Sequence, residues 1–185
     1  MDKKLLQRLL KKYPGPFIFL LEIPEEKYFE ESVETIRALV AMGYAGVCLS
    51  FIRPCRNFLE LLQASKVDTQ NLQVVDVAAA LAKQTAEKNN QCVHISEEVE
   101  TSELVEAVYT SVAKLAAKNT FVFIDSIRII SLYKPLSEIM RFSDFLIREL
   151  KHAEIRGIII NVPKGLARER FLREIALHAD EKISL

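Results

Sequence analysis

Three carboxylates lie at the end of the first apolar run of the chain and just after it, at a junction that often carries chemistry. The run PFIFLLE ends at Glu22, and Glu25 and Glu26 come directly after Pro24. A helical pattern begins within a few residues, so the segment reads as strand, turn and helix. In α/β proteins this junction often holds a glycine-rich loop whose backbone amides bind a phosphate. Here it has no glycine and adds negative charge, which indicates that the phosphate site is lost.

Cysteine and histidine are the other residue types whose side chains could react or bind a metal. Cys48 lies in an apolar run and reads as a buried thiol. Cys92 and His94 are two residues apart, and with Cys55 they could be imagined as metal ligands. No zinc-site spacing is present, however, and three cysteines do not make a disulfide framework. We therefore expect no metal and no cofactor.

The composition favours one folded domain over residues 1–185. Half of the residues are hydrophobic, 27% are charged, and the formal net charge is zero. The balanced charge gives no general attraction to nucleic acid or to an anionic membrane. No apolar run approaches the ~20 residues of a membrane span. Residues 1–12 mix leucines with lysines and predict an amphipathic helix instead of a signal peptide, docked on protein in preference to lipid. We expect a cytoplasmic protein.

Short apolar runs alternate with longer segments of helical period along the chain. The expected strands are Pro16–Glu22, Ala45–Phe51, Leu72–Val77, Thr120–Ser126, Gly157–Val162 and Lys182–Leu185. They are continuous in their hydrophobicity, as strands buried on both faces of a parallel sheet are. Gly43 and Gly157 sit where helix C-caps belong. The pattern predicts an α/β fold with a doubly wound, mainly parallel sheet flanked by helices.

Several of these segments resemble the RecA-like ATPases, especially the KaiC and RadA branch. The run FVFIDS, ending at Ser126, is similar to the Walker B strand of that family. CLSFIRPCRNFL, from Cys48, resembles its second core strand and the proline turn that follows. LQVVD and the tail HADEKISL are similar to two further strands, so the likeness covers about Tyr13 to Leu185. It implies a sheet in which Gly157–Val162 separates the first strand from the Walker B strand.

The chain departs from this family where the family binds phosphate. The resemblance places G-x-x-x-x-G-K-[ST] after the first strand, and here that position reads EIPEEKYF. Lys27 is one position out of register, and Tyr28 stands where the hydroxyl that binds Mg²⁺ belongs. Glu25 and Glu26 are instead expected to cap the N-terminal end of the helix, where the helix dipole stabilises negative charge. The motif is therefore a degenerate Walker A.

A second departure concerns the catalytic acid. KaiC-like ATPases carry paired glutamates after the second strand, whereas this chain has Ile52 and Arg53. Neither side chain can act as a general base at neutral pH. Of the hydrolytic elements Asp125 alone remains, and it can also be read as a carboxylate that caps the turn after its strand. We therefore expect no catalytic residue and no ATP hydrolysis.

These observations favour a non-catalytic RecA-like domain that works through protein contacts or self-association. The degenerate positions Glu25, Glu26, Tyr28 and Arg53 are its candidate interface. One alternative is a nucleotide-binding site of nonstandard type around Asp125 and Arg53. Another is a nucleic-acid accessory protein that uses basic residues between Arg148 and Arg173. The alternative to a RecA-like fold is a flavodoxin-like or receiver-like sheet.

Overall fold

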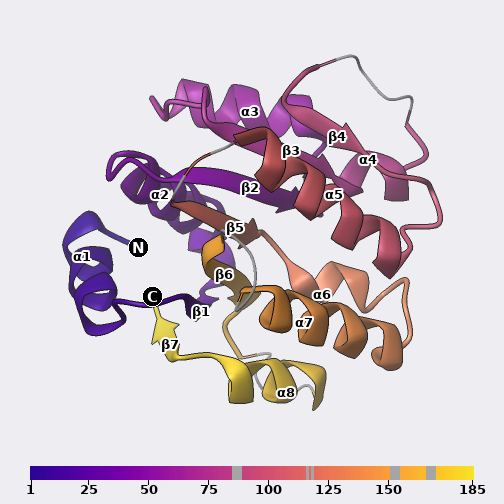
Figure 1. Cartoon of the computed structure of the whole chain (residues 1–185). Helices are drawn as coiled ribbons and strands as arrows, with labels where there is room; N and C mark the ends of the chain where they lie inside the picture. The colour runs from indigo at the N-terminus through magenta and orange to yellow at the C-terminus, as the bar shows by residue number, and fades with distance from the viewer. Residues whose placement is uncertain (85–88, 116, 118, 151–154, 166–169) are drawn as a thin grey trace.

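Seven parallel strands form one sheet at the centre of the molecule (Figure 1). The computed structural model describes residues 1–84, 89–115, 117, 119–150, 155–165 and 170–185. The strands are β1 (Phe17–Ile23), β2 (Ala45–Ser50), β3 (Leu72–Asp76), β4 (Cys92–His94), β5 (Thr120–Ile124), β6 (Ile155–Pro163) and β7 (Glu181–Ser184). Their order in the sheet is β4-β3-β2-β5-β6-β1-β7.

Helices cover both faces of this sheet. On one face lie α1 (Lys3–Lys12), α2 (Tyr28–Val40) and α3 (Cys55–Ala64), and on the other α5 (Thr101–Leu115), α7 (Leu136–Leu150) and α8 (Arg170–His178). Three short helices complete the chain: η1 (Glu25–Lys27), α4 (Val77–Leu81) and α6 (Ile127–Ile130). The predicted doubly wound α/β architecture is confirmed.

The alternation of side chains along each strand builds a separate core on each face. Phe17, Phe19 and Leu21 of β1 pack with the apolar residues of α1, α2 and α3. Ile18 and Leu20 point the other way and pack with those of α5, α7 and α8. Because successive side chains of a strand point to opposite faces, a strand buried on both sides must be apolar throughout. This is why the continuous runs in the sequence identify the strands.

The strand order agrees with the RecA-like expectation. β6 lies between β1 and β5 and pairs with both, so the first strand and the Asp125 strand are not neighbours. A flavodoxin-like order would pair the first strand with the third instead. The expected strand Leu72–Val77 ends one residue earlier, since the Asp76 carboxylate accepts a hydrogen bond from the backbone N–H of Ala79 and caps α4. The short strand β4 was not predicted.

The two glycines expected at helix C-caps have different roles. Gly43 follows α2 with a φ of +82°, which confirms the prediction there. Gly157 lies inside β6, so its prediction as a cap is wrong. A Cβ at this position would lie 2.1 Å from Cζ of Phe17, whose buried ring stacks on Phe19. The missing side chain therefore makes room for an aromatic ring of the neighbouring strand.

The N-terminal amphipathic helix docks on its own chain. Leu6 and Leu9 of α1 are buried in the same core as α2, and α1 packs directly on α2. Beyond the helix, the Tyr13 hydroxyl donates to the backbone oxygen of Asp180, 2.8 Å away, and Lys12 Nζ lies 2.6 Å from a carboxylate oxygen of Glu181. In the part of the chain that the structure describes, no helix is both long and apolar enough to cross a membrane.

Candidate functional site

The loops that follow β1, β2 and β5 meet at the carboxyl edge of the sheet. Doubly wound folds bind their ligands at this edge. η1 and the start of α2 follow β1, the turn with Arg53 follows β2, and Asp125 follows β5. Tyr28, Arg53 and Asp125 line one small cavity here. The structure thus brings together three of the seven residues that the sequence singles out.

Asp125 is buried and holds the turn after the neighbouring strand. Its carboxylate accepts hydrogen bonds from the backbone N–H groups of Phe51 (2.8 Å) and Ile52 (3.2 Å). The Ser50 hydroxyl lies 3.2 Å from the same carboxylate and 2.7 Å from the backbone oxygen of Arg53. Burial raises the pKa of Asp125 to about 6, although these hydrogen bonds lower it. Asp125 was expected to cap the turn after its own strand. Its carboxylate instead mainly caps the turn after β2.

Tyr28, the first residue of α2, reaches the loop that follows β5. Its hydroxyl donates a hydrogen bond to the backbone oxygen of Asp125. Burial raises the pKa of Tyr28, and the charge of Asp125 acts in the same direction. One turn later the Ser32 hydroxyl donates to the backbone oxygen of Tyr28 at 2.6 Å and accepts from Asn161 of β6 at 2.8 Å. These bonds tie the start of α2 to β5 and β6.

The cavity beside these residues is very small. Arg53 lies over the ring of Phe29, with the guanidinium carbon 4.8 Å from the ring centre. Tyr28, Ile52 and Asp125 form much of the wall of the cavity, whose volume is about 20 Å³. That is room for about one water molecule. The Tyr28 hydroxyl and the Asp125 carboxylate, which both line the cavity, make hydrogen bonds that hold the neighbouring loops in place.

The remaining predicted residues lie outside this cavity. Glu22 is buried in β1, and its carboxylate lies 2.9 Å from Nζ of Lys182 in β7. Glu25, Glu26 and Lys27 are exposed on η1. No side-chain hydrogen bond caps η1 or α2, so the expectation of capping carboxylates is corrected: their negative charge lies near the N-terminal end of α2 without a capping bond.

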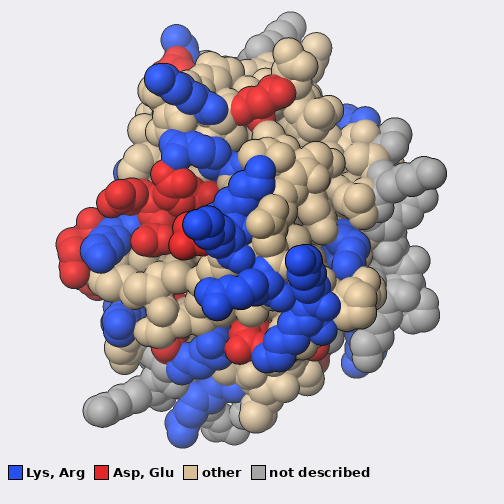
Figure 2. All heavy atoms as spheres, turned by 90° about the vertical axis from the view of Figure 1, so that its left-hand side faces the viewer, with Lys and Arg blue, Asp and Glu red and all other residues tan. Residues whose placement is uncertain are grey.

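Among the described residues between Arg148 and Arg173, basic side chains lie at opposite edges of the sheet. Arg156 lies at the amino end of β6 and donates to the backbone oxygen of Pro14 at 2.7 Å. Lys164 follows the carboxyl end of the same strand, at the opposite edge of the sheet. Lys151 and Arg168 fall outside the described residues. Lysines and arginines gather instead on the side of the molecule where α1 lies (Figure 2); those of α1 are Lys3, Lys4, Arg8, Lys11 and Lys12.

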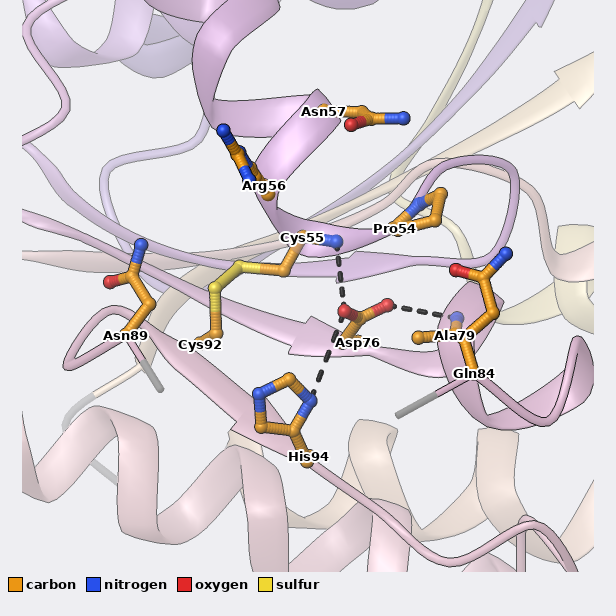
Figure 3. A pocket seen from close by; sticks show the side chains of 10 residues that line it. All are labelled: Pro54, Cys55, Arg56, Asn57, Asp76, Ala79, Gln84, Asn89, Cys92 and His94. Atoms are coloured by element: carbon orange, nitrogen blue, oxygen red, sulfur yellow. Dashed lines mark hydrogen bonds and ion pairs between the residues drawn. A yellow bond between two sulfur atoms is a disulfide. The ribbon is translucent and has the colours of Figure 1, made fainter. Parts of the chain in front are cut away.

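A second cluster of chemical groups lies at the same edge, beside β3 and β4 (Figure 3). Cys55 at the start of α3 and Cys92 of β4 form a disulfide, a pairing that the sequence analysis did not predict. Asp76, at the end of β3, accepts from the backbone N–H of Cys55 at 2.9 Å and lies 3.9 Å from Nδ1 of His94. Cys48 stays a buried free thiol, as predicted.

The sequence carried only a faint signal for this second cluster. Cys92 and His94 are two apart on a strand and so share one face of it, but the strand itself was missed. The partner Cys55 is separated from Cys92 by 37 residues. Only the pairing of β4 with β3 brings the two cysteines together.

Comparison with known proteins shows similarity of structure alone. No family model matches the sequence, and no curated protein matches it. Among solved structures, the uncharacterized protein PH0321 from Pyrococcus horikoshii, solved in complex with an unknown peptide, has a TM-score of 0.70 at 13% identity, covering 100% of this chain and 84% of that one.

Two further solved structures resemble the chain. The KaiC-like protein PH0186 from Pyrococcus horikoshii has a TM-score of 0.61 at 16% identity, covering 92% of this chain and 71% of that one. The flagellar accessory protein FlaH from Methanocaldococcus jannaschii has a TM-score of 0.56 at 11% identity, with the same coverage. With its seven parallel strands flanked by helices, the chain has the RecA-like α/β fold of these KaiC-like proteins.

Proposed function

We propose that this protein is a non-catalytic RecA-like domain, a pseudo-ATPase that acts in the cytoplasm through protein contacts at the carboxyl edge of its sheet. The observation that carries this proposal is the cavity of about 20 Å³ beside Tyr28 and Asp125. A nucleotide needs a site many times larger, since small-molecule pockets measure roughly 300–1,000 Å³. The Tyr28 side chain and its hydrogen bond to Asp125 hold this region closed.

The electrostatics of the edge support the same conclusion. A phosphate loop presents backbone N–H groups and a lysine to an anion. Here the corresponding turn presents the exposed carboxylates of Glu25 and Glu26. Their charge repels a triphosphate but suits a basic segment of a protein partner.

Apolar groups at the same edge add the second element of a protein interface. Leu132 and Tyr133, in the turn between α6 and α7, are 72% and 57% exposed, and Ile52 is 39% exposed. Interfaces combine apolar and aromatic anchors with a polar rim. Fold alone does not fix function, but PH0321 was solved in complex with an unknown peptide, which gives a precedent for peptide binding on this fold.

Titration with Mg-ATP is expected to show no saturable binding tighter than about 1 mM, roughly −4 kcal/mol. The reason is steric and electrostatic: the cavity has room for about one water molecule, and the turn after β1 carries the exposed carboxylates of Glu25 and Glu26. Isothermal titration calorimetry with the full chain measures this directly. Saturable binding in the micromolar range that disappears in an Asp125→Ala variant would instead establish the nonstandard nucleotide site as the function.

Charge reversal on η1 is expected to weaken assembly. In a Glu25→Lys/Glu26→Lys variant, self-association or binding to a recovered protein partner should fall at least about tenfold, which corresponds to 1.4 kcal/mol. Both side chains are exposed, and η1 has no side-chain capping hydrogen bond to lose, so folding should stay intact. Sedimentation velocity of wild type and variant, alone and with the partner, provides the measurement.

A matched control for this variant is Glu97→Lys/Glu98→Lys. These two adjacent exposed glutamates follow β4, at the far end of the sheet, and give the same change in net charge. The control should associate as the wild type does. Equal association of wild type and the Glu25/Glu26 variant would exclude this edge as the interface.

A further inference from the structure

A cluster of side chains that can bind a metal or react surrounds the Cys55–Cys92 disulfide, outside the proposed interface. A pocket of about 140 Å³ opens beside it, lined by both cysteines, Asp76 and His94 (Figure 3). Cys55 is 1% exposed, whereas Cys92 is only partly buried. A reductant can therefore reach Cys92 from the pocket.

Three metal-binding side chains converge on this pocket once the disulfide is opened. Cys92 and His94 are separated by one residue on β4, so their side chains leave the same face of the strand. Cys55 faces them from the first turn of α3, with its Cα atom 5.9 Å from that of Cys92. Two sulfurs bound to one zinc ion at 2.3 Å lie about 3.7 Å apart. Rotation of the two side chains about their Cα–Cβ bonds can supply this separation.

Asp76 supplies the support that a histidine ligand requires. Its carboxylate lies 3.9 Å from Nδ1 of His94, and Figure 3 shows the second ring nitrogen on the side of Cys92. Zinc-bound histidines usually direct their other nitrogen to a carboxylate, which fixes the ring and its tautomer. Asp76 is itself fixed by the backbone N–H groups of Cys55 and Ala79.

We propose that the reduced protein binds one zinc ion through Cys55, Cys92 and His94, with Asp76 as the positioning residue. A dithiol reductant donates two electrons and two protons to the disulfide, giving two thiols and its own disulfide. Zinc then displaces both thiol protons and binds two thiolates and a neutral imidazole. Three protein ligands leave the fourth tetrahedral position open to the pocket. With the disulfide closed, the described residues contain no cluster of three or more His, Cys, Asp or Glu side chains that could hold a metal ion.

The cellular location favours the dithiol form. Disulfides are rare in the cytoplasm, where cysteines brought together in this way more often bind metal. This step rests on the cytoplasmic location that is part of the proposed function. The test uses purified protein of defined redox state, so its result does not depend on that location or on the interface at Glu25 and Glu26.

The test is a zinc titration of the full chain in both redox states. Protein reduced with a phosphine in the presence of a chelator, then freed of both under nitrogen, is titrated against a chromogenic zinc indicator. The expected result is one zinc ion per chain in the reduced form and none in the oxidised form. Cobalt(II) in place of zinc should give a thiolate-to-cobalt charge-transfer band and the visible spectrum of a four-coordinate ion.

Variants separate this site from adventitious metal binding. Cys92→Ser and His94→Ala should each weaken binding at least a hundredfold, and Asp76→Asn roughly ten- to a hundredfold. Cys48→Ala removes the third, buried thiol and should leave the stoichiometry at one. Zinc should also raise the urea midpoint of the reduced protein and leave that of the oxidised protein unchanged. Folded reduced protein that takes up no zinc, or uptake that survives His94→Ala, would overturn the proposal.

Discussion

Opening the Cys55–Cys92 disulfide, with a chelator present, is expected to lower the free energy of unfolding by about 4 kcal/mol. The bridge spans 37 residues, and the chain-entropy model assigns a closed loop of that length a stabilisation of this order. β4 should open first, because it has only three residues and pairs with β3 alone. Urea unfolding with and without reductant measures the total loss, and hydrogen exchange at the β4 amides locates it.

A Cys55→Ala/Cys92→Ala variant separates the bridge from side effects of the reductant. It should lack the stabilisation and should not respond to reductant at all. If wild type and this variant unfold at the same urea concentration under oxidising conditions, the disulfide does not contribute to stability.

The second large effect is a loss of stability with rising pH that comes from Asp125. Burial raises its pKa in the folded protein to about 6, from an ordinary value of 3.8. Below pH 3.8 the carboxyl is protonated in both states, and its contribution to stability is fully present. Between pH 4 and 6 the unfolded chain ionises first, so stability falls by about 3 kcal/mol at ~1.4 kcal/mol per pH unit, and it levels off above pH 6.

The difference in stability between wild type and Asp125→Asn isolates this contribution, because the amide cannot ionise. The advantage of the wild type should shrink by about 3 kcal/mol from pH 4 to pH 7 in urea unfolding. Asp68→Asn, which changes an exposed carboxylate in the loop before β3, controls for the loss of a charge. An advantage that instead grows with pH would mean that the hydrogen bonds from Phe51 and Ile52 outweigh burial.

Much of the fold could be predicted from the sequence because the strands are buried on both faces. A run such as TFVFI is short and rich in β-branched and aromatic residues, which favours a strand inside a sheet, and it forms β5. β4 could not be predicted, since Cys-Val-His is too short and too mixed to show a period. The role of Gly157 was predicted wrongly because the Phe17 ring, which leaves no room for a side chain there, lies on another strand.

The hydrogen bonds around Tyr28 and Asp125 could not be predicted from the sequence. The motif comparison placed Tyr28 where a metal-binding hydroxyl belongs, and Asp125 at the end of its strand. That the Tyr28 hydroxyl reaches the backbone oxygen of Asp125 depends on how α2 sits over the sheet, which involves β5, β6 and β2 together. Contacts of this kind depend on packing between elements, which local sequence patterns do not encode.

The two outermost strands limit how copies of this chain can assemble. An exposed strand edge carries unpaired N–H and C=O groups and can recruit a strand from another molecule. Here β4 has three residues, and β7 has four, with the charged Glu181 and Lys182 among them. Edges this short and charged are poor templates for joining two sheets into one. Any assembly of this protein should therefore leave each sheet separate and form through loops and helix surfaces, which can be released without breaking a shared hydrogen-bond ladder.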